Sequence, residues 1–121
     1  MELKPLLEYR SVNDWLDGLR EHWGGDPVTD DPDRLPLLEA FCRFVETDPD
    51  TVIQECLRID KAGDQRISMK GRRRYAELID EFQAQSTETR LRKAKRGNTI
   101  RSFLIHNGIH LAAGAQMVKK T

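Results

Sequence analysis

The side chains that could do chemistry are concentrated in two basic clusters in the second half of the chain. One lies in MKGRRR, residues 69–74, and the other in RLRKAKRGNTIR, residues 90–101. Lysine and arginine bind phosphate oxygens by charge-assisted hydrogen bonds, and short polar side chains beside them reach base edges or phosphates. The candidate nucleic-acid contacts are Lys70, Arg72, Arg73, Arg74, Arg90, Arg92, Lys93, Lys95, Arg96, Asn98, Thr99 and Arg101, with Ser102 as a further short polar residue.

The charges are divided sharply between the two halves of the chain. Residues 1–64 hold sixteen acidic and seven basic residues, a net charge of −9, whereas residues 65–121 hold four acidic and thirteen basic residues, a net charge of +9. This split favours a polyanionic partner for the second half. The alternative is that the two halves attract each other and neutralise their charges within the molecule.

Four potential metal ligands form only a weak pattern. His106 and His110 are four residues apart, but Gly108 lies between them and should end the helix that would align them. Cys42 and Cys56 are fourteen residues apart and form no Cys-x-x-Cys pair. We therefore expect no metal site and no cofactor, and we expect two buried thiols on apolar helix faces.

No arrangement typical of a catalytic centre is present in the sequence. It lacks the G-x-S-x-G, H-E-x-x-H and G-x-x-x-x-G-K-[ST] motifs, and its acidic residues gather in loop-like runs such as TDDPD. Tyr75 lies on the apolar face of a predicted helix, so we expect a core residue rather than a nucleophile. The sequence predicts a binding protein, not an enzyme, and no small-molecule substrate.

Apolar residues recur at helical spacing along the chain, and no segment reads convincingly as a strand. The spacing predicts helices over residues 12–23, 34–45 and 49–57, a fourth from the MKGRRR segment to about residue 82, and a last one from residue 86 or 87 to 106. Ser11, Asp33 and Asp48 should cap the first three helices. GGDPVTDDPD should be an exposed loop and KAGDQ a break, and no run is long and apolar enough to cross a membrane.

The last predicted helix has no single apolar stripe. At 100° per residue, one side holds Leu91, Ala94 and Ile105, and the other holds Ile100, Phe103 and Leu104. Either the helix breaks at Gly97-Asn98, or its second half is buried all round. In both cases residues 99–109 should anchor the segment in a helical bundle, and the basic first half should project its cations away from the core.

Four segments in order carry a family resemblance: VNDWLDGLREHW, LPLLEAFCRFVETDPD, RRRYAELIDEFQAQS and TIRSFLIHNGIHL. Their order resembles the N-terminal core-binding, SAM-like helical domain of tyrosine recombinases and phage integrases. The most specific part is the ending, where Phe103, Asn107, Gly108 and Ile109 match the aromatic turn and the Asn-Gly-Ile of that family. The resemblance covers about residues 10–111.

The resemblance implies an all-α fold, a small bundle of four to five helices that clamps duplex DNA. In the family the second and last helices of the domain lie against the major groove. The last helix here is rich in cations, whereas the second offers only Arg34 and Arg43, and Gly97 stands where the family usually has an apolar residue. The catalytic residues of the family come from a later domain, so we expect this chain to bind DNA and not to cut it.

These expectations divide the chain into an N-terminal arm (1–10), a helical DNA-binding domain (11–109) and the start of a linker toward an absent catalytic domain (110–121). The expected partners are duplex DNA and other recombinase protomers, in DNA recombination or integration, and no membrane. The N-terminus lacks the pattern of a secretory signal, and buried thiols fit a cytoplasmic protein. The alternative function is a helical protein–protein interaction or oligomerisation module without DNA binding.

Overall fold

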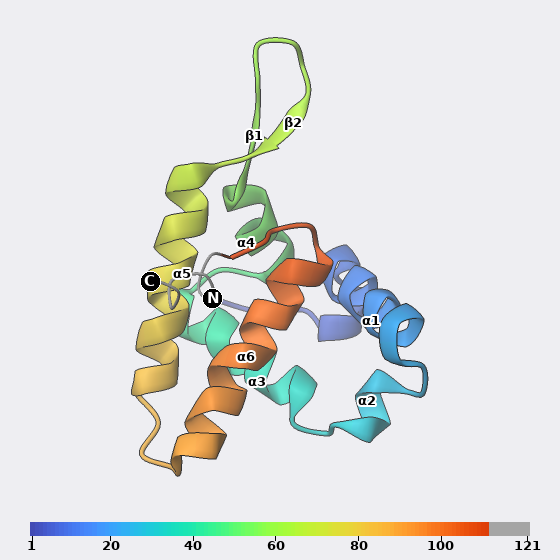
Figure 1. Cartoon of the computed structure of the whole chain (residues 1–121), viewed down its shortest axis with the longest axis vertical. Coiled ribbons are helices and arrows are strands. Elements are labelled where there is room, and N and C mark those ends of the chain that lie inside the picture. Colours follow the sequence, from blue (N-terminus) through green and yellow to red (C-terminus); the bar gives the residue numbers. More distant parts are fainter. Residues whose placement is uncertain (112–121) are drawn as a thin grey trace, which may run out of the picture.

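The computed structural model describes residues 1–111 of the chain (Figure 1). Its elements, in chain order, are η1 (Leu6–Glu8), α1 (Arg10–Trp23), α2 (Pro27–Asp30), α3 (Arg34–Val45), α4 (Pro49–Glu55), β1 (Leu57–Ile59), β2 (Gln65–Ile67), α5 (Met69–Ala84) and α6 (Arg90–His106). The mostly helical architecture predicted from the sequence is confirmed. The linker prediction for residues 110–121 lies almost wholly outside the described residues.

Helix α6 is the centre of the bundle, because α5, α1 and α3 all pack against it. Its Phe103 is fully buried and meets Trp15 of α1 edge to face, with ring centroids 5.5 Å apart. Phe41 of α3 meets Phe82 of α5 in the same way at 5.3 Å. Each buried aromatic ring removes a large apolar area from water. One contact joins α1 to α6 and the other joins α3 to α5, and all four rings belong to one core cluster.

The start of α1 differs from the prediction. The helix begins at Arg10 with Tyr9 as its N-cap, and Ser11 lies inside the first turn. Ser11 is buried, and its backbone N–H and its hydroxyl both donate to Oδ1 of Asp50, at 2.8 and 2.5 Å. The serine therefore ties α1 to α4 instead of capping its own helix. Asp48 does cap α4 as predicted, accepting from the Thr51 N–H at 2.8 Å.

A β-hairpin replaces the predicted break, so the expectation of a chain without strands was wrong. β1 and β2 pair antiparallel with Leu57 opposite Ile67, and the hairpin stands out from one end of the bundle (Figure 1). Asp60 closes its turn, because one carboxylate oxygen accepts the N–H groups of Ala62 and Asp64, each at 2.9 Å. Strands of three residues with an arginine in the middle are too short to give a periodic signal.

The acidic loop, which was expected to be irregular, is more ordered than predicted. The acidic loop contains the short helix α2, whose N-cap Asp26 accepts from the Val28 N–H at 3.0 Å. The N-terminal arm packs on the bundle, since Leu3 and Leu6 contact the core and Tyr9 is buried. The arm is therefore part of the folded domain.

Helix α6 runs unbroken from Arg90 to His106, so the predicted break at Gly97-Asn98 does not occur. Its N-cap is Thr89, slightly later than expected. Gly97 lets α5 approach closely, because a Cβ on Gly97 would lie 1.9 Å from Oε1 of Gln83. The other option, a second half that is buried all round, holds in part. Neighbouring helices pack against the C-terminal half of α6, but Ile105 remains exposed.

Candidate nucleic-acid interface

The two basic clusters lie at opposite ends of an antiparallel pair of helices. Three contacts fix the direction: Arg72 of α5 meets His110, Asp80 meets Arg101, and Phe82 meets Arg96. Both clusters occupy helix starts, as the sequence predicts, but antiparallel starts are far apart. A helix of the length of α5 spans about 24 Å, so the clusters cannot form one continuous patch.

The cluster at the start of α5 is partly engaged within the protein. Arg74 pairs with Glu55 of α4 at 3.2 Å, and Arg72 donates to the backbone oxygen of His110 at 3.2 Å. Lys70 and Arg73 are exposed and form no ion pair with any residue in the range 1–111. Lys70 and Arg73 are therefore the cations at the start of α5 that can bind a ligand without breaking an ion pair.

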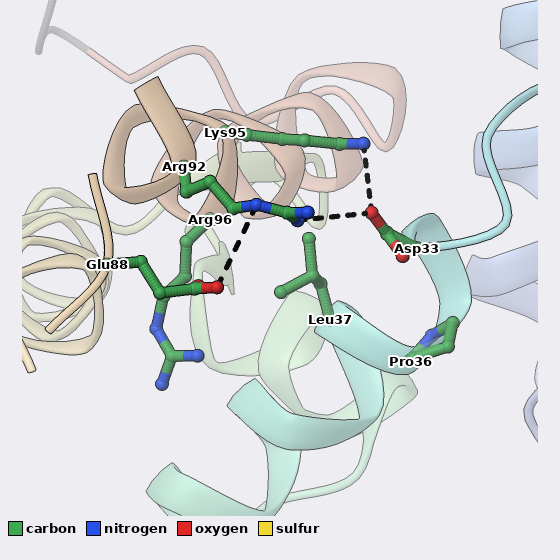
Figure 2. Close-up of a pocket in the computed structure, with 7 residues that line it drawn as sticks. All are labelled: Asp33, Pro36, Leu37, Glu88, Arg92, Lys95 and Arg96. Carbon is green, nitrogen blue, oxygen red and sulfur yellow. Dashed lines mark hydrogen bonds and ion pairs between the residues drawn. The ribbon is translucent and has the colours of Figure 1, made fainter. Parts of the chain in front are cut away.

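Acidic residues of the first half neutralise part of the α6 cluster. Lys95 lies 2.9 Å from Asp31 and 3.3 Å from Asp33, and Arg92 lies 3.8 Å from both Asp33 and Glu88. Figure 2 shows Lys95 and Arg92 reaching toward Asp33 from α6. At this place the alternative interpretation of the charge split holds, because the two halves of the chain attract each other.

The pKa values of this network reflect the same pairing. Burial would raise the pKa of Asp31, but the hydrogen bonds from Lys95 and from the Asp33 N–H outweigh it and hold that pKa below its ordinary value. Hydrogen bonding to Asp31 raises the pKa of Lys95. Both groups are therefore charged at neutral pH, and each is the chief partner of the other.

Arg96 is a structural residue. Its guanidinium lies over the ring of Phe82, 3.7 Å from the centroid, and its Nε donates to the Phe82 backbone oxygen at 2.7 Å. In Figure 2 it points away from Asp33. The sequence prediction placed this arginine with the phosphate contacts, whereas the structure uses it to cover the aromatic core.

The three short polar residues of α6 have different surroundings. Thr99 is buried, and Ser102 accepts a hydrogen bond from the indole N–H of Trp15 at 3.0 Å, so both serve the packing of the helix. Thr99 as a base or phosphate contact was therefore a wrong prediction. Asn98 is exposed and accepts from Nη1 of Arg101 at 2.9 Å, which leaves its amide N–H groups facing solvent.

Arg101 is held in place by α5. Its Nη2 lies 2.9 Å from Oδ1 of Asp80, and its Nη1 lies 3.1 Å from Oε1 of Gln83. Only 19% of its side chain is exposed. It presents a fixed guanidinium edge beside Asn98 instead of a free cation.

One face of α6 is only partly covered by the bundle. It is a stripe of residues spaced three and four apart, here called the outward stripe: Leu91, Ala94, Asn98, Arg101 and Ile105. Leu91 is 82% exposed and Ile105 is 42% exposed, although both are apolar. Arg90 and Lys93 lie at the N-terminal end of the same helix and form no ion pair within the described chain.

Three cations that the sequence interpretation left out lie on the hairpin. Arg58, Lys61 and Arg66 are all exposed, and the hairpin leads directly into the start of α5. The signal that could have found them is the repeated Arg-Ile pair, in LRI and QRI, on either side of the Asp/Gly turn. Lys70, Arg73, Arg90 and Lys93 are called the unpaired helix cations below.

Other chemistry is sparse in the described residues. Cys42 and Cys56 are buried as expected, and burial raises the pKa of each thiol to about 12. Tyr75 is a fully buried core residue whose hydroxyl donates to Glu55. Within residues 1–111 no three His, Cys, Asp or Glu side chains gather as metal ligands, and no helix there is long and apolar enough to cross a membrane.

The residues that carry the family resemblance form the end of α6. Phe103 and Ile109 are fully buried, and Gly108 takes a left-handed conformation with φ of 88°. The Asn107 side chain donates to the backbone oxygens of Ser11 and Phe103, at 3.0 and 2.9 Å. The motif thus fastens the end of α6 to α1. The chain matches no protein-family model, no curated protein and no solved structure.

Proposed function

We propose that this chain binds duplex DNA as the core-binding domain of a tyrosine recombinase of the phage integrase type, and that it catalyses no reaction itself. The observation that supports this most is the outward stripe: the central helix packs against α5, α1 and α3 and still leaves Leu91, Asn98 and Ile105 exposed. The same helix begins with two cations, Arg90 and Lys93, which form no ion pair with any acid in residues 1–111.

The size of α6 suits the major groove. A helix with its side chains is about 10–12 Å across, and the groove is about 12 Å wide. Asn98 near the middle of the stripe has the donor and acceptor groups that pair with adenine, and Leu91 is an apolar contact for a thymine methyl group. Ala94, between them, is short enough to let the helix approach the base edges.

The unpaired helix cations supply the phosphate contacts. Arg90 and Lys93 lie at the start of α6, and Lys70 and Arg73 at the start of α5, at opposite ends of the helix pair. DNA that runs along this pair meets cations at both ends of the bound segment. Arg92 and Lys95 contribute less, because Asp31 and Asp33 already neutralise them.

The outward stripe also favours a second function. Leu91, Asn98 and Ile105 are seven residues apart, which is the repeat by which one helix packs along another. A partner helix, from another protomer or another protein, would cover the two exposed apolar side chains. This is the interaction-module alternative, and it uses the same face of α6.

Fluorescence anisotropy with a labelled duplex of about 30 base pairs tests the proposal. Each neutralised phosphate contributes about −0.9 to the slope of log affinity against log salt, so the four unpaired helix cations predict a slope of about −3.6 or steeper. Binding that weakens in this way supports the proposal. Absence of binding at low salt overturns it.

One substitution separates the two functions by opposite effects. Leu91→Lys places a cation on the outward stripe, so it should strengthen DNA binding and steepen the salt slope. The same cation should weaken any helix pairing through that stripe, which light scattering would detect as a lower mass. Unchanged DNA binding and an unchanged salt slope in Leu91→Lys would show that the outward stripe does not face DNA.

A further inference from the structure

The β1–β2 hairpin stands clear of the bundle and is exposed on every side near its tip (Figure 1). It carries Arg58 on β1, Lys61 in the turn and Arg66 on β2. The bundle does not need this projection for its core, since only Leu57 and Ile67 at its base pack against the core cluster. The exposed part of the hairpin is thus free to serve a ligand.

Two of these cations occupy an unfavourable arrangement. Arg58 lies directly opposite Arg66 in the antiparallel register, so both guanidinium groups stand on the same face of the hairpin. Like charges directly opposite each other destabilise a strand pair. A two-stranded hairpin is marginal in water to begin with, so this placement works against the hairpin unless an anion binds there.

Within the described residues, only one of these two arginines has an acidic partner. Arg66 Nε lies 2.9 Å from Oδ2 of Asp60, and this hydrogen bond is the first cause of the lowered pKa of that carboxyl. Arg58 and Lys61 form no ion pair within residues 1–111. The nearest remaining acid along the hairpin is Asp64, which is exposed in the turn. The positive charge therefore outweighs the negative charge on this projection.

The hairpin and the start of α5 form one continuous structural unit. Ser68 joins them: its N–H donates to the Cys56 oxygen at 2.7 Å, and its hydroxyl accepts from the Gly71 N–H at 3.1 Å as the cap of α5. Lys70 and Arg73 follow within one turn of that cap. We call the five cations Arg58, Lys61, Arg66, Lys70 and Arg73 the hairpin–α5 surface.

We infer that the hairpin–α5 surface is a second phosphate-binding element, which holds the backbone of duplex DNA beyond the segment that α6 contacts. The inference rests on the proposed function, because it assumes the same ligand. The two contacts are separated by the length of α5, about 24 Å, which corresponds to about seven base pairs. The hairpin–α5 surface should bind DNA of any sequence, because its cations contact phosphates and it places no groups against base edges.

The test is Arg58→Glu, which should affect stability and binding in opposite directions. The new carboxylate faces Arg66 across the strands, so the like-charge pair becomes a favourable pair and the melting temperature should stay the same or rise. DNA binding should weaken about eightfold or more at 0.1 M salt, and the salt slope should become shallower by about 0.9, because one phosphate contact is lost. Lys61→Glu, in the turn where no strand pairing depends on it, should act in the same direction.

Arg10→Glu is the matched control, because Arg10 has a side chain 91% exposed on α1 and the charge change is identical. Hydroxyl-radical footprinting locates the effect: Arg58→Glu should remove protection at one end of the site and leave the rest. If both hairpin variants bind like the Arg10→Glu control, the inference is wrong and the proposed function stands. If the unaltered chain fails to bind duplex DNA at low salt, both are wrong.

Discussion

The Arg96 guanidinium lies over the ring of Phe82 and donates its Nε hydrogen to the backbone oxygen of the same residue. One arginine on α6 thereby makes a cation–π contact and a charge-assisted hydrogen bond to one residue of α5. The two helices are joined at this point in the N-terminal half of α6. An arginine in a basic run is thus a structural residue.

Arg96→Ala should therefore destabilise the fold by about 2 kcal/mol, the sum expected for a cation–π contact and a hydrogen bond from a charged donor. Urea denaturation measures this change in the free energy of unfolding. Arg96→Lys should recover little, because an ammonium group has no planar face to stack on the ring. Arg90→Ala is the control and should change stability by less than about 0.5 kcal/mol. Equal stability of the Arg96 and Arg90 variants would show that the stacking contributes nothing.

Arg90→Ala with Lys93→Ala should weaken DNA binding without loss of stability. Both side chains lie at the start of α6 and have no ion pair in the described residues. Their removal should make the salt slope shallower by about 1.8 and weaken binding to unrelated DNA sequences alike. Arg92→Ala should cost less, because Asp33 and Glu88 already partly neutralise Arg92. The opposite ranking, measured by anisotropy, would mean that the ion pairs with Asp33 and Glu88 open when DNA binds.

Gly71→Ala should destabilise the protein by about 2 kcal/mol or more. A Cβ at this position would lie 2.0 Å from the backbone oxygen of Glu55, and backbone cannot move aside without shifting α4 against α5. The strain exceeds the gain of about 1 kcal/mol that alanine offers inside a helix. Urea denaturation of the variant would measure the net effect.

Gly97→Ala is the matched substitution, because its Cβ would meet the end of the Gln83 side chain, 1.9 Å from Oε1, and not backbone. The end of the Gln83 side chain can rotate away. The protein then loses the hydrogen bond from Arg101 to Gln83 but keeps the stabilisation that alanine gives inside a helix. Its net effect should stay within about 1 kcal/mol of zero. Similar losses in the Gly71 and Gly97 variants would contradict this distinction between backbone and side-chain neighbours.

Lys95→Met should raise the pKa of Asp31. The burial that opposes ionisation would remain, while the hydrogen bond from Lys95 that favours the carboxylate would be gone. In the unaltered chain the lowered pKa means that Asp31 stabilises the fold above its ordinary pKa of about 3.9, and this contribution is lost as the pH falls through the folded value. As the pH falls, the Lys95→Met variant should begin to lose the stabilising contribution of ionised Asp31 at a higher pH than the unaltered chain.

Carbon NMR titration of the aspartate carboxyl groups measures this pKa directly. Arg92→Met is the control, because Arg92 pairs with Asp33 and Glu88 and does not pair with Asp31. Its Asp31 pKa should remain close to that of the unaltered chain. An Asp31 pKa that is insensitive to Lys95 would show that the interaction with Lys95 is screened by solvent.

Most of the long helices were predictable because they repeat apolar residues on one face, whereas α6 has no single apolar stripe. Phe41 of α3 and Phe82 of α5 lie where that spacing places them, fully or almost fully buried. The hairpin was not predictable in this way, because three-residue strands give no periodic signal. At Gly97, Gln83 of α5 lies so close that a Cβ would meet its side chain, a contact that spacing along α6 does not reveal.

The candidate site was predictable in its composition and not in its arrangement. The sequence shows that cations concentrate at the starts of the last two helices, and the structure places them there. It does not show that the helices run antiparallel, or that Asp31 and Asp33 fold back onto Lys95. Such contacts join residues more than sixty positions apart, and local spacing carries no information about them.

The acidic loop before α3 competes with any anion that approaches the start of α6. A ligand that competes for Lys95 must replace two carboxylates, those of Asp31 and Asp33, which are already in place at 2.9 and 3.3 Å. An isolated carboxylate on another protein offers less negative charge than these residues together. Duplex DNA carries one negative charge for about every 1.7 Å of its axis and exceeds this local charge density. The loop thus turns a generally anion-attracting helix into one that favours polyanions over ordinary acidic surfaces.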